Sequence, residues 1–105
     1  MPAPNPAELN ELEAGLLALE AGSATAALDW LRRATFRDPH SAIAQFALAR
    51  AYMLDGDVAH GHTALIQARR LLAPLDGASL VPGSDAMPVE TLRQTIHTHL
   101  EGLRE

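Results

Sequence analysis

Residues 24–57 read ATAALDWLRRATFRDPHSAIAQFALARAYMLDGD, two apolar patterns separated by a proline. In each pattern small and aliphatic residues recur three and four positions apart, which is the spacing of one face of an α-helix. Pro39 separates the patterns because the residue before a proline is driven out of helical geometry. Ser41 and Asp57 each stand directly before an apolar run and are good helix caps. The stretch therefore predicts a helix, a turn, a second helix and the start of a third.

The flanking residues repeat this pattern at an offset of 34 positions. Gly22 matches Gly56, and apolar residues match in the same register, as in the pairs Leu9 and Ile43, Leu12 and Phe46, Leu31 and Leu65, and Ala34 and Ala68. A 34-residue period is typical of repeats that each contain two helices. One such pair cannot cover its own apolar face, so the units stack and leave a grooved surface. The expected fold class is all-α.

We expect a single domain of five helices. The predicted segments are a proline-rich lead-in at 1–6, two helix pairs at 7–72, a loop at 73–87 and a capping helix at 88–105. Within them, helices are expected at about 7–21, 24–37, 42–54, 58–72 and 88–103. Val89, Leu92, Ile96 and Leu100 form one stripe on the last helix, as expected of a helix that closes the end of a stack.

Composition excludes several classes of function. The net charge is −5, and the sequence contains neither lysine nor cysteine. An acidic chain without a basic run is a poor nucleic-acid binder, and a chain without cysteine has no disulfide framework and no thiol nucleophile. No apolar run approaches the ~20 residues of a membrane helix, and the start lacks the features of a signal peptide. We expect a cytoplasmic protein without membrane insertion.

The repeat resembles the tetratricopeptide (TPR) family at specific positions. The second helix matches the family's small–aromatic–small series at Ala27, Leu31 and Ala34, and Pro39 closes the unit. The corresponding positions of the next unit are Leu48, Ala49, Tyr52, Gly61, Leu65 and Ala68. Gly15 stands where the family places a small residue at a helix contact. Glu11 and Gln45 depart from the family, which usually has tryptophan there. The resemblance implies two TPR helix-turn-helix hairpins followed by a capping helix.

A more particular resemblance covers nearly the whole chain. Residues 24–38, the run Phe46-Ala47-Leu48-Ala49, and Leu80-Val81-Pro82-Gly83-Ser84-Asp85 before Leu92-Arg93 are similar to the TPR segment of some CheR-type chemoreceptor methyltransferases. The sequence has no Gly-rich strand-to-helix turn for a nucleotide-like cofactor, so we expect neither enzyme activity nor a cofactor. The resemblance implies a docking role in bacterial chemosensory signalling, with a chemoreceptor tail, a signalling protein or the methyltransferase as partner.

The predicted partner-binding residues form the inward stripe of the first helix of each pair. They are Leu9, Leu12, Leu16 and Leu19, followed by Ile43, Phe46, Arg50 and Met53. An apolar groove suits a partner helix or an extended peptide, and Arg50 could bind a carboxylate. The alternative is that these residues are core, covered by the final helix or by a second copy in a homodimer, because two repeats fall below the three that a stable stack usually needs.

Other residues admit two interpretations. The arginines of the second helix could form a basic edge for an acidic partner, or could simply be solvated charges near a helix C-terminus. Trp30 could fill a seam or serve as an exposed contact. The five histidines lack the spacing of a metal site, so no metal is expected. Ser84 and Asp85 are expected to form a turn, with Asp85 or a neighbour capping the last helix.

Overall fold

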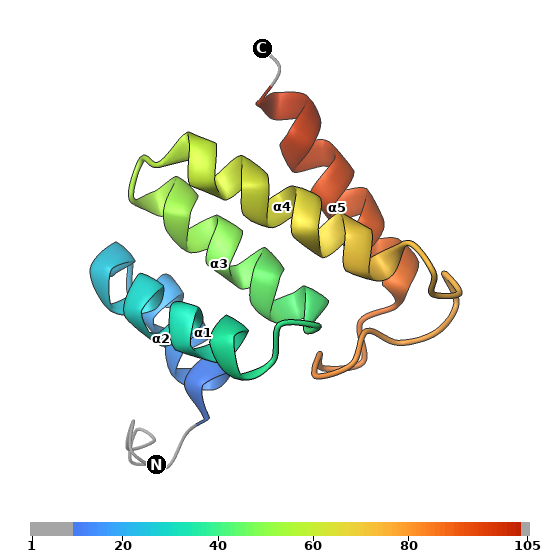
Figure 1. Cartoon of the computed structure of the whole chain (residues 1–105), viewed down its shortest axis with the longest axis horizontal. Coiled ribbons are helices and arrows are strands. Elements are labelled where there is room, and N and C mark those ends of the chain that lie inside the picture. The colour runs from blue at the N-terminus through green and yellow to red at the C-terminus, as the bar shows by residue number, and fades with distance from the viewer. Residues whose placement is uncertain (1–9, 104–105) are drawn as a thin grey trace.

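The computed structural model describes residues 10–103 and contains five helices in that range (Figure 1). Their bounds are α1 Glu11–Glu20, α2 Ala24–Arg37, α3 Ala42–Leu54, α4 Val58–Leu72 and α5 Val89–Gly102. The described part of the chain has no β-strand, and its one isolated bridge joins Leu80 to Pro88. The all-α prediction is confirmed.

Side-chain caps explain where three helices begin. The side-chain oxygens of Asn10, Ser41 and Asp57 accept hydrogen bonds from the backbone N–H three residues later, at 2.8, 3.1 and 3.1 Å. Such bonds satisfy N–H groups that have no partner within the helix. The bounds of α2, α3 and α4 agree with the prediction. The expected start of the first helix near Ala7 is wrong, because Asn10 has an extended backbone and caps a helix that begins at Glu11.

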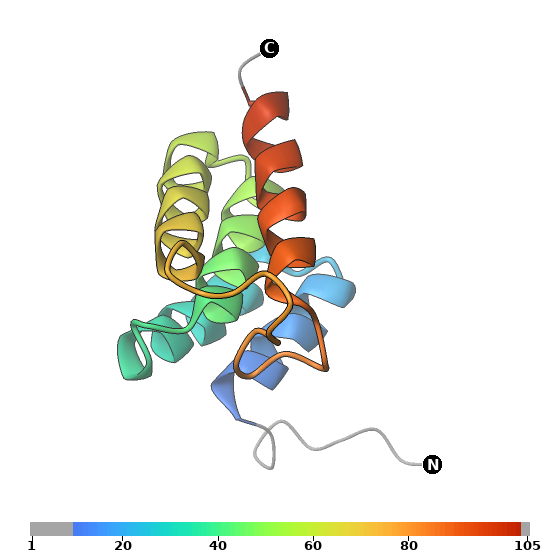
Figure 2. The same cartoon turned by 90° about the vertical axis from the view of Figure 1, so that its right-hand side faces the viewer.

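Each helix packs against the next one along the chain, and α3 lies at the centre of the fold (Figure 2). One face of α3 joins α1 and α2 in a cluster of buried residues that includes Ala27, Leu28, Leu31, Ala47 and Leu48. Its other face joins α4, α5 and the preceding loop in a larger cluster that includes Phe46, Leu65, Leu72, Leu92 and Ile96. Helix α3 therefore contributes to both clusters, and Leu12 packs against each of them.

The loop between α4 and α5 is held to the core by its own backbone. Val81 is buried, and its N–H donates to the Met87 carbonyl at 2.8 Å. Ser84 forms a turn as predicted, since its hydroxyl donates to the Val81 carbonyl and accepts from the Met87 N–H. Helix α5 has Pro88 at its N-cap and no side-chain cap, so the expected capping by Asp85 is wrong. Loop carbonyls take that role instead, with Ser79 accepting from the Val89 N–H at 2.8 Å.

Arg93 fastens α5 to the end of α4. Its guanidinium donates to the carbonyl of Leu72 at 2.8 Å and to that of Leu75, and it also pairs with Glu90 at 3.3 Å. The last carbonyls of a helix have no partner within the helix and carry partial negative charge. Arg93 gives the Leu72 carbonyl a hydrogen-bond donor and places a positive charge at the C-terminal end of α4. Helix α5 is therefore joined to α4 by polar bonds as well as by apolar contacts.

Candidate functional site

Two of the predicted partner-binding residues lie in the core. Ile43 and Phe46 are only 9% and 8% exposed, within the cluster that α3 forms with α4 and α5. The edge of the His99 ring meets the Phe46 ring at a centroid distance of 5.6 Å. Helix α5 therefore covers the N-terminal half of α3, where part of the partner-binding groove was predicted. Both residues are buried: His99 of α5 contacts Phe46, and the loop at Gly83 lies next to Ile43.

The predicted residues of the first helix lie in different surroundings. Leu12 and Leu16 are half-buried and pack against the α1/α2/α3 cluster, and Leu12 also reaches the larger cluster on the far side of α3. These two leucines therefore join the helix pairs. Leu9 lies outside the described residues.

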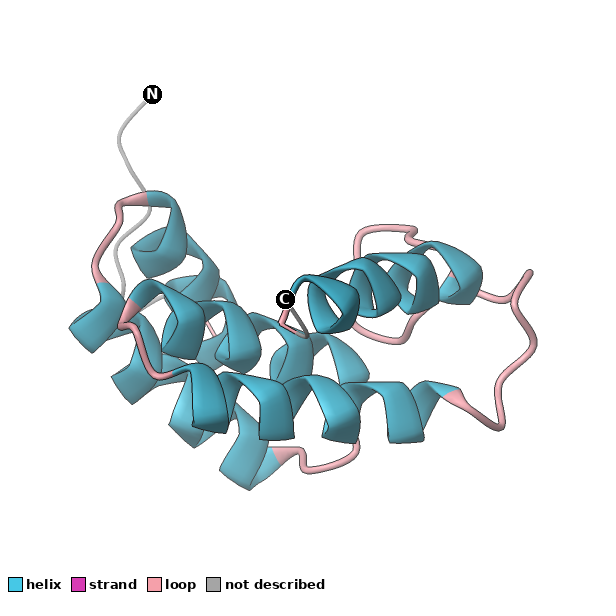
Figure 3. Cartoon of the chain, turned by 90° about the horizontal axis from the view of Figure 1, so that it is seen from above, coloured by secondary structure: helices cyan, strands magenta, loops and turns pink. Residues whose placement is uncertain are grey.

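The remaining three predicted residues come together at one place. Leu19, Arg50 and Met53 line a cleft of about 340 Å³, whose other lining residues are Leu54 and His99. We call this the α1–α3–α5 cleft, after the helices that supply its walls. Seen from above, α1 and α2 lie on one side of the fold and α5 lies on another (Figure 3). The volume is within the range of small-molecule and side-chain pockets.

The cleft combines apolar walls with one unpaired cation. Arg50 is exposed, and none of the described residues forms an ion pair or hydrogen bond with it. His99 is held in place on the opposite wall, because its Nδ1 lies 2.8 Å from the Thr95 carbonyl oxygen. A carbonyl oxygen can only accept, so Nδ1 carries the proton of that bond. An arginine beside apolar walls can bind a carboxylate through bidentate hydrogen bonds.

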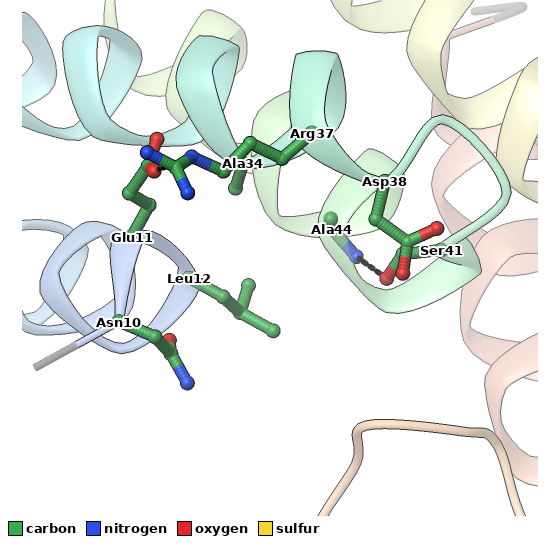
Figure 4. Close-up of a pocket in the computed structure, with 8 residues that line it drawn as sticks. All are labelled: Asn10, Glu11, Leu12, Ala34, Arg37, Asp38, Ser41 and Ala44. Atoms are coloured by element: carbon green, nitrogen blue, oxygen red, sulfur yellow. Dashed lines mark hydrogen bonds and ion pairs between the residues drawn. The ribbon is translucent and has the colours of Figure 1, made fainter.

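A second hollow of about 410 Å³ lies where α1, α2 and the start of α3 meet (Figure 4). Four of its polar side chains already have structural roles, and the carboxylate of Asp38 is the fifth that lines it. Asn10 and Ser41 cap helices, and the side chains of Glu11 and Arg37 form an ion pair between α1 and α2. Because these groups are already satisfied, a ligand would have to displace existing bonds. The α1–α3–α5 cleft is therefore the better candidate site.

A polar network on the outer surface links the helix pairs. Arg32 of α2 lies over the Tyr52 ring of α3 and donates to its hydroxyl at 3.4 Å, which raises the pKa of Arg32. The His60 ring stacks on the Tyr52 ring, with centroids 5.2 Å apart, and its Nδ1 lies 2.7 Å from the Asp57 carboxylate. This network has a structural explanation, since it joins α2, α3 and α4.

Metal clusters and membrane-spanning helices are both absent from the described part of the chain. Within residues 10–103, no cluster of three or more histidines or acids has the arrangement of a metal site. The helices in the same range are all too short or too polar to cross a bilayer.

Comparisons with protein-family models, with curated proteins and with solved structures found no match for this chain. The assignment to the TPR family stays a prediction that rests on the residues quoted above.

Sequence reasoning missed two residues of the cleft, Leu54 and His99. Leu54 follows Arg50 by four positions on α3, so the helical spacing that selected Arg50 could also have selected Leu54. His99 carries no such signal. It lies on α5, and only the position of that helix across α3 brings it to the cleft.

Proposed function

We propose that this chain is a protein–protein interaction module of the TPR type, and that the α1–α3–α5 cleft binds a short segment of a partner protein. The unpaired Arg50 between the apolar side chains of Leu19 and Met53 carries the proposal. The chemistry of the cleft favours a segment that places an apolar side chain beside a carboxylate. The carboxylate would bind Arg50, and the apolar group would displace water from the leucine and methionine side chains.

A random peptide library displayed on phage and selected on the intact chain tests this proposal. The selected peptides should share an acidic residue next to an apolar one. Their affinity, measured by calorimetry, should fall at least tenfold in Arg50→Gln, because the charge-assisted bonds are lost. Arg70→Gln is the matched control, since Arg70 is also exposed but lies on α4 outside the cleft. Equal binding to wild type and Arg50→Gln would refute the assignment of the cleft.

We further propose that the partner belongs to bacterial chemosensory signalling. The support is the resemblance of residues 80–85 and the following helix to the TPR segment of CheR-type methyltransferases. Calorimetry with a chemoreceptor C-terminal tail peptide, a chemosensory signalling protein and a CheR-type methyltransferase domain would test it. Binding that depends on Arg50 would support this setting. Absence of binding to all three, with peptides still selected from the library, would remove the chemosensory setting and leave the module.

Homodimerisation is the second candidate, and exposed apolar residues next to the cleft favour it. Leu54 lines the cleft and Val58 begins the following helix, and both are about half exposed. A second copy could cover them. Light scattering at micromolar concentration distinguishes the two proposals, since a monomer of 11.2 kDa would argue against the dimer.

A further inference from the structure

Helix α2 carries a second surface that the proposed cleft does not use. Phe36 is 89% exposed, the most exposed of the large apolar side chains described. Around it lies a shallow hollow of about 740 Å³ on the outer face of α2, with Glu11 of α1 at its border. We call this the α2 surface, and its lining residues from α2 are Asp29, Trp30, Arg32, Arg33, Phe36 and Arg37.

The repeat does not require aromatic residues at these positions. By the 34-residue offset, Phe36 corresponds to Arg70 and Trp30 corresponds to Ala64. Arg70 is an exposed charge, and Ala64 is a small buried residue. The second helix pair therefore packs without an aromatic side chain at either position. The exposed Phe36 is thus not explained by the packing of the helix pair, whereas Trp30 is half-buried.

The arginines of this surface are held in place by their neighbours. The Arg33 guanidinium lies 5.2 Å from the centre of the Trp30 ring and pairs with Asp29 at 3.1 Å. Arg37 pairs with Glu11 across the α1/α2 seam. Aromatic and arginine side chains are the residue types enriched at the energetic centres of protein interfaces. Arginines that are already oriented lose less side-chain entropy when a partner binds.

Charge indicates the kind of partner. The α2 surface has three arginines and two acids, a net charge of +1. The whole chain has eight cations and thirteen acids, which leaves five cations and eleven acids elsewhere, a net charge of −6. The α2 surface is therefore the positive face of an acidic protein. A second copy would have to bring two such faces together in a symmetric dimer, and like charges would oppose that contact.

We propose that the α2 surface is a second docking site, which binds an acidic helix or strand of another protein that inserts apolar side chains around Phe36. This site is separate from the α1–α3–α5 cleft and does not depend on it. The partner's carboxylates would face Arg32, which forms no ion pair with the described residues, whereas Arg33 and Arg37 are already paired with Asp29 and Glu11.

Two synthetic peptides provide the test. One is a 14-residue helix former with leucines at helical spacing and glutamates elsewhere, and the other replaces every glutamate by lysine. Trp30 is the single tryptophan of the chain, so its fluorescence reports directly on this surface. We expect saturable binding of the glutamate peptide to wild type, weakened by salt, and no binding of the lysine peptide.

Two variants assign the binding to a surface. Phe36→Ser should weaken binding of the glutamate peptide at least tenfold. It should not lower the melting temperature of the protein, because the Phe36 side chain is exposed. Arg50→Gln should leave this binding unchanged, which separates the α2 surface from the cleft. Equal binding of the two peptides, or unchanged binding in Phe36→Ser, would overturn the proposal.

Two further measurements test other occupants of the surface. A concentration-dependent change of Trp30 emission without peptide, lost in Phe36→Ser, would assign the surface to a second copy instead. A change of Trp30 emission on deletion of residues 2–8 would assign it to the chain's own lead-in. Either result would overturn the proposal.

Discussion

The helix pairs α1/α2 and α3/α4 share one 34-residue register, yet matching positions in them have different surroundings. Phe46 is buried under α5, whereas Leu12, its counterpart in the first pair, is half-buried and borders two open hollows. Arg50 is exposed in the cleft, whereas its counterpart Leu16 is half-buried against the α1/α2/α3 cluster. The residue's place in the repeat therefore does not decide its burial. For Phe46, the helix that follows in the stack decides it.

The difference between the pairs also separates core from binding surface. Helix α5 and its loop close the end formed by α3/α4, and the side chains that α5 exposes are almost all polar. The outer face of α2 has no such cover in the described part of the chain, and Phe36 is exposed there. The outer face of α2 lies where α5 leaves the helix pairs uncovered, whereas the α1–α3–α5 cleft lies beside α5, with His99 in its wall.

The largest expected effect is a difference in stability between two matching positions. Phe46→Ala should lower the free energy of unfolding by about 3–5 kcal/mol, because it opens a cavity beneath α5. Leu12→Ala should cost about half as much or less, since solvent already reaches that side chain. Urea unfolding followed by circular dichroism measures both. Equal losses would contradict the claim that α5 makes the two pairs different.

A smaller effect is expected where α5 is attached to α4. Arg93→Met keeps the length of the side chain but removes the guanidinium donor from the carbonyls of Leu72 and Leu75, of which Leu72 still accepts from the Leu75 N–H. The expected loss is about 1–3 kcal/mol, the usual range for removing a charged hydrogen-bond partner. Arg70→Met is the control, since Arg70 is exposed in the last turn of α4 and none of the described residues pairs with it. Similar unfolding midpoints for the two variants would show that Arg93 does not fasten α5.

Much of the fold could be predicted from the sequence because its signals are local. Pro39, Ser41 and Asp57 act within three residues of their own positions, and they set the bounds of three helices. The predicted start of the first helix is too early. Asn10, which caps this helix, lies within an apolar pattern that favours an earlier start.

The candidate site was harder to predict because it depends on distant contacts. The stripe containing Ile43 and Phe46 has the same spacing whether α5 covers it or a partner does. Arg93 acts on carbonyls 18 and 21 residues away, and His99 reaches the cleft from another helix. The exposure of Phe36 did have a signal, since it lies off the stripe of Leu28, Leu31 and Ala34 that packs inward.

The smallest expected effect concerns the first residues of α2 and α4. Ser23 and Asp57 occupy the same position in the two pairs, but only Asp57 forms a side-chain cap. The backbone N–H of His60 bonds to the Asp57 carboxylate and, together with the His60 side chain, lowers the pKa of Asp57. A carboxyl group with a lowered pKa in the folded state stabilises the fold above its unfolded pKa of about 3.9. That stability is lost as pH falls through the folded pKa.

Asp57→Asn isolates this contribution, because asparagine caps helices well and has no titrating carboxyl group. The urea midpoint of wild type should fall as pH decreases from about 5 to about 2, and Asp57→Asn should show a slightly shallower decrease. Asp55→Asn removes an acid two residues away that does not cap α4, and it should follow wild type. Identical slopes for wild type and Asp57→Asn would mean that the cap of α4 contributes no more acid sensitivity than the uncharged start of α2, and the two pairs would then be equivalent at this position.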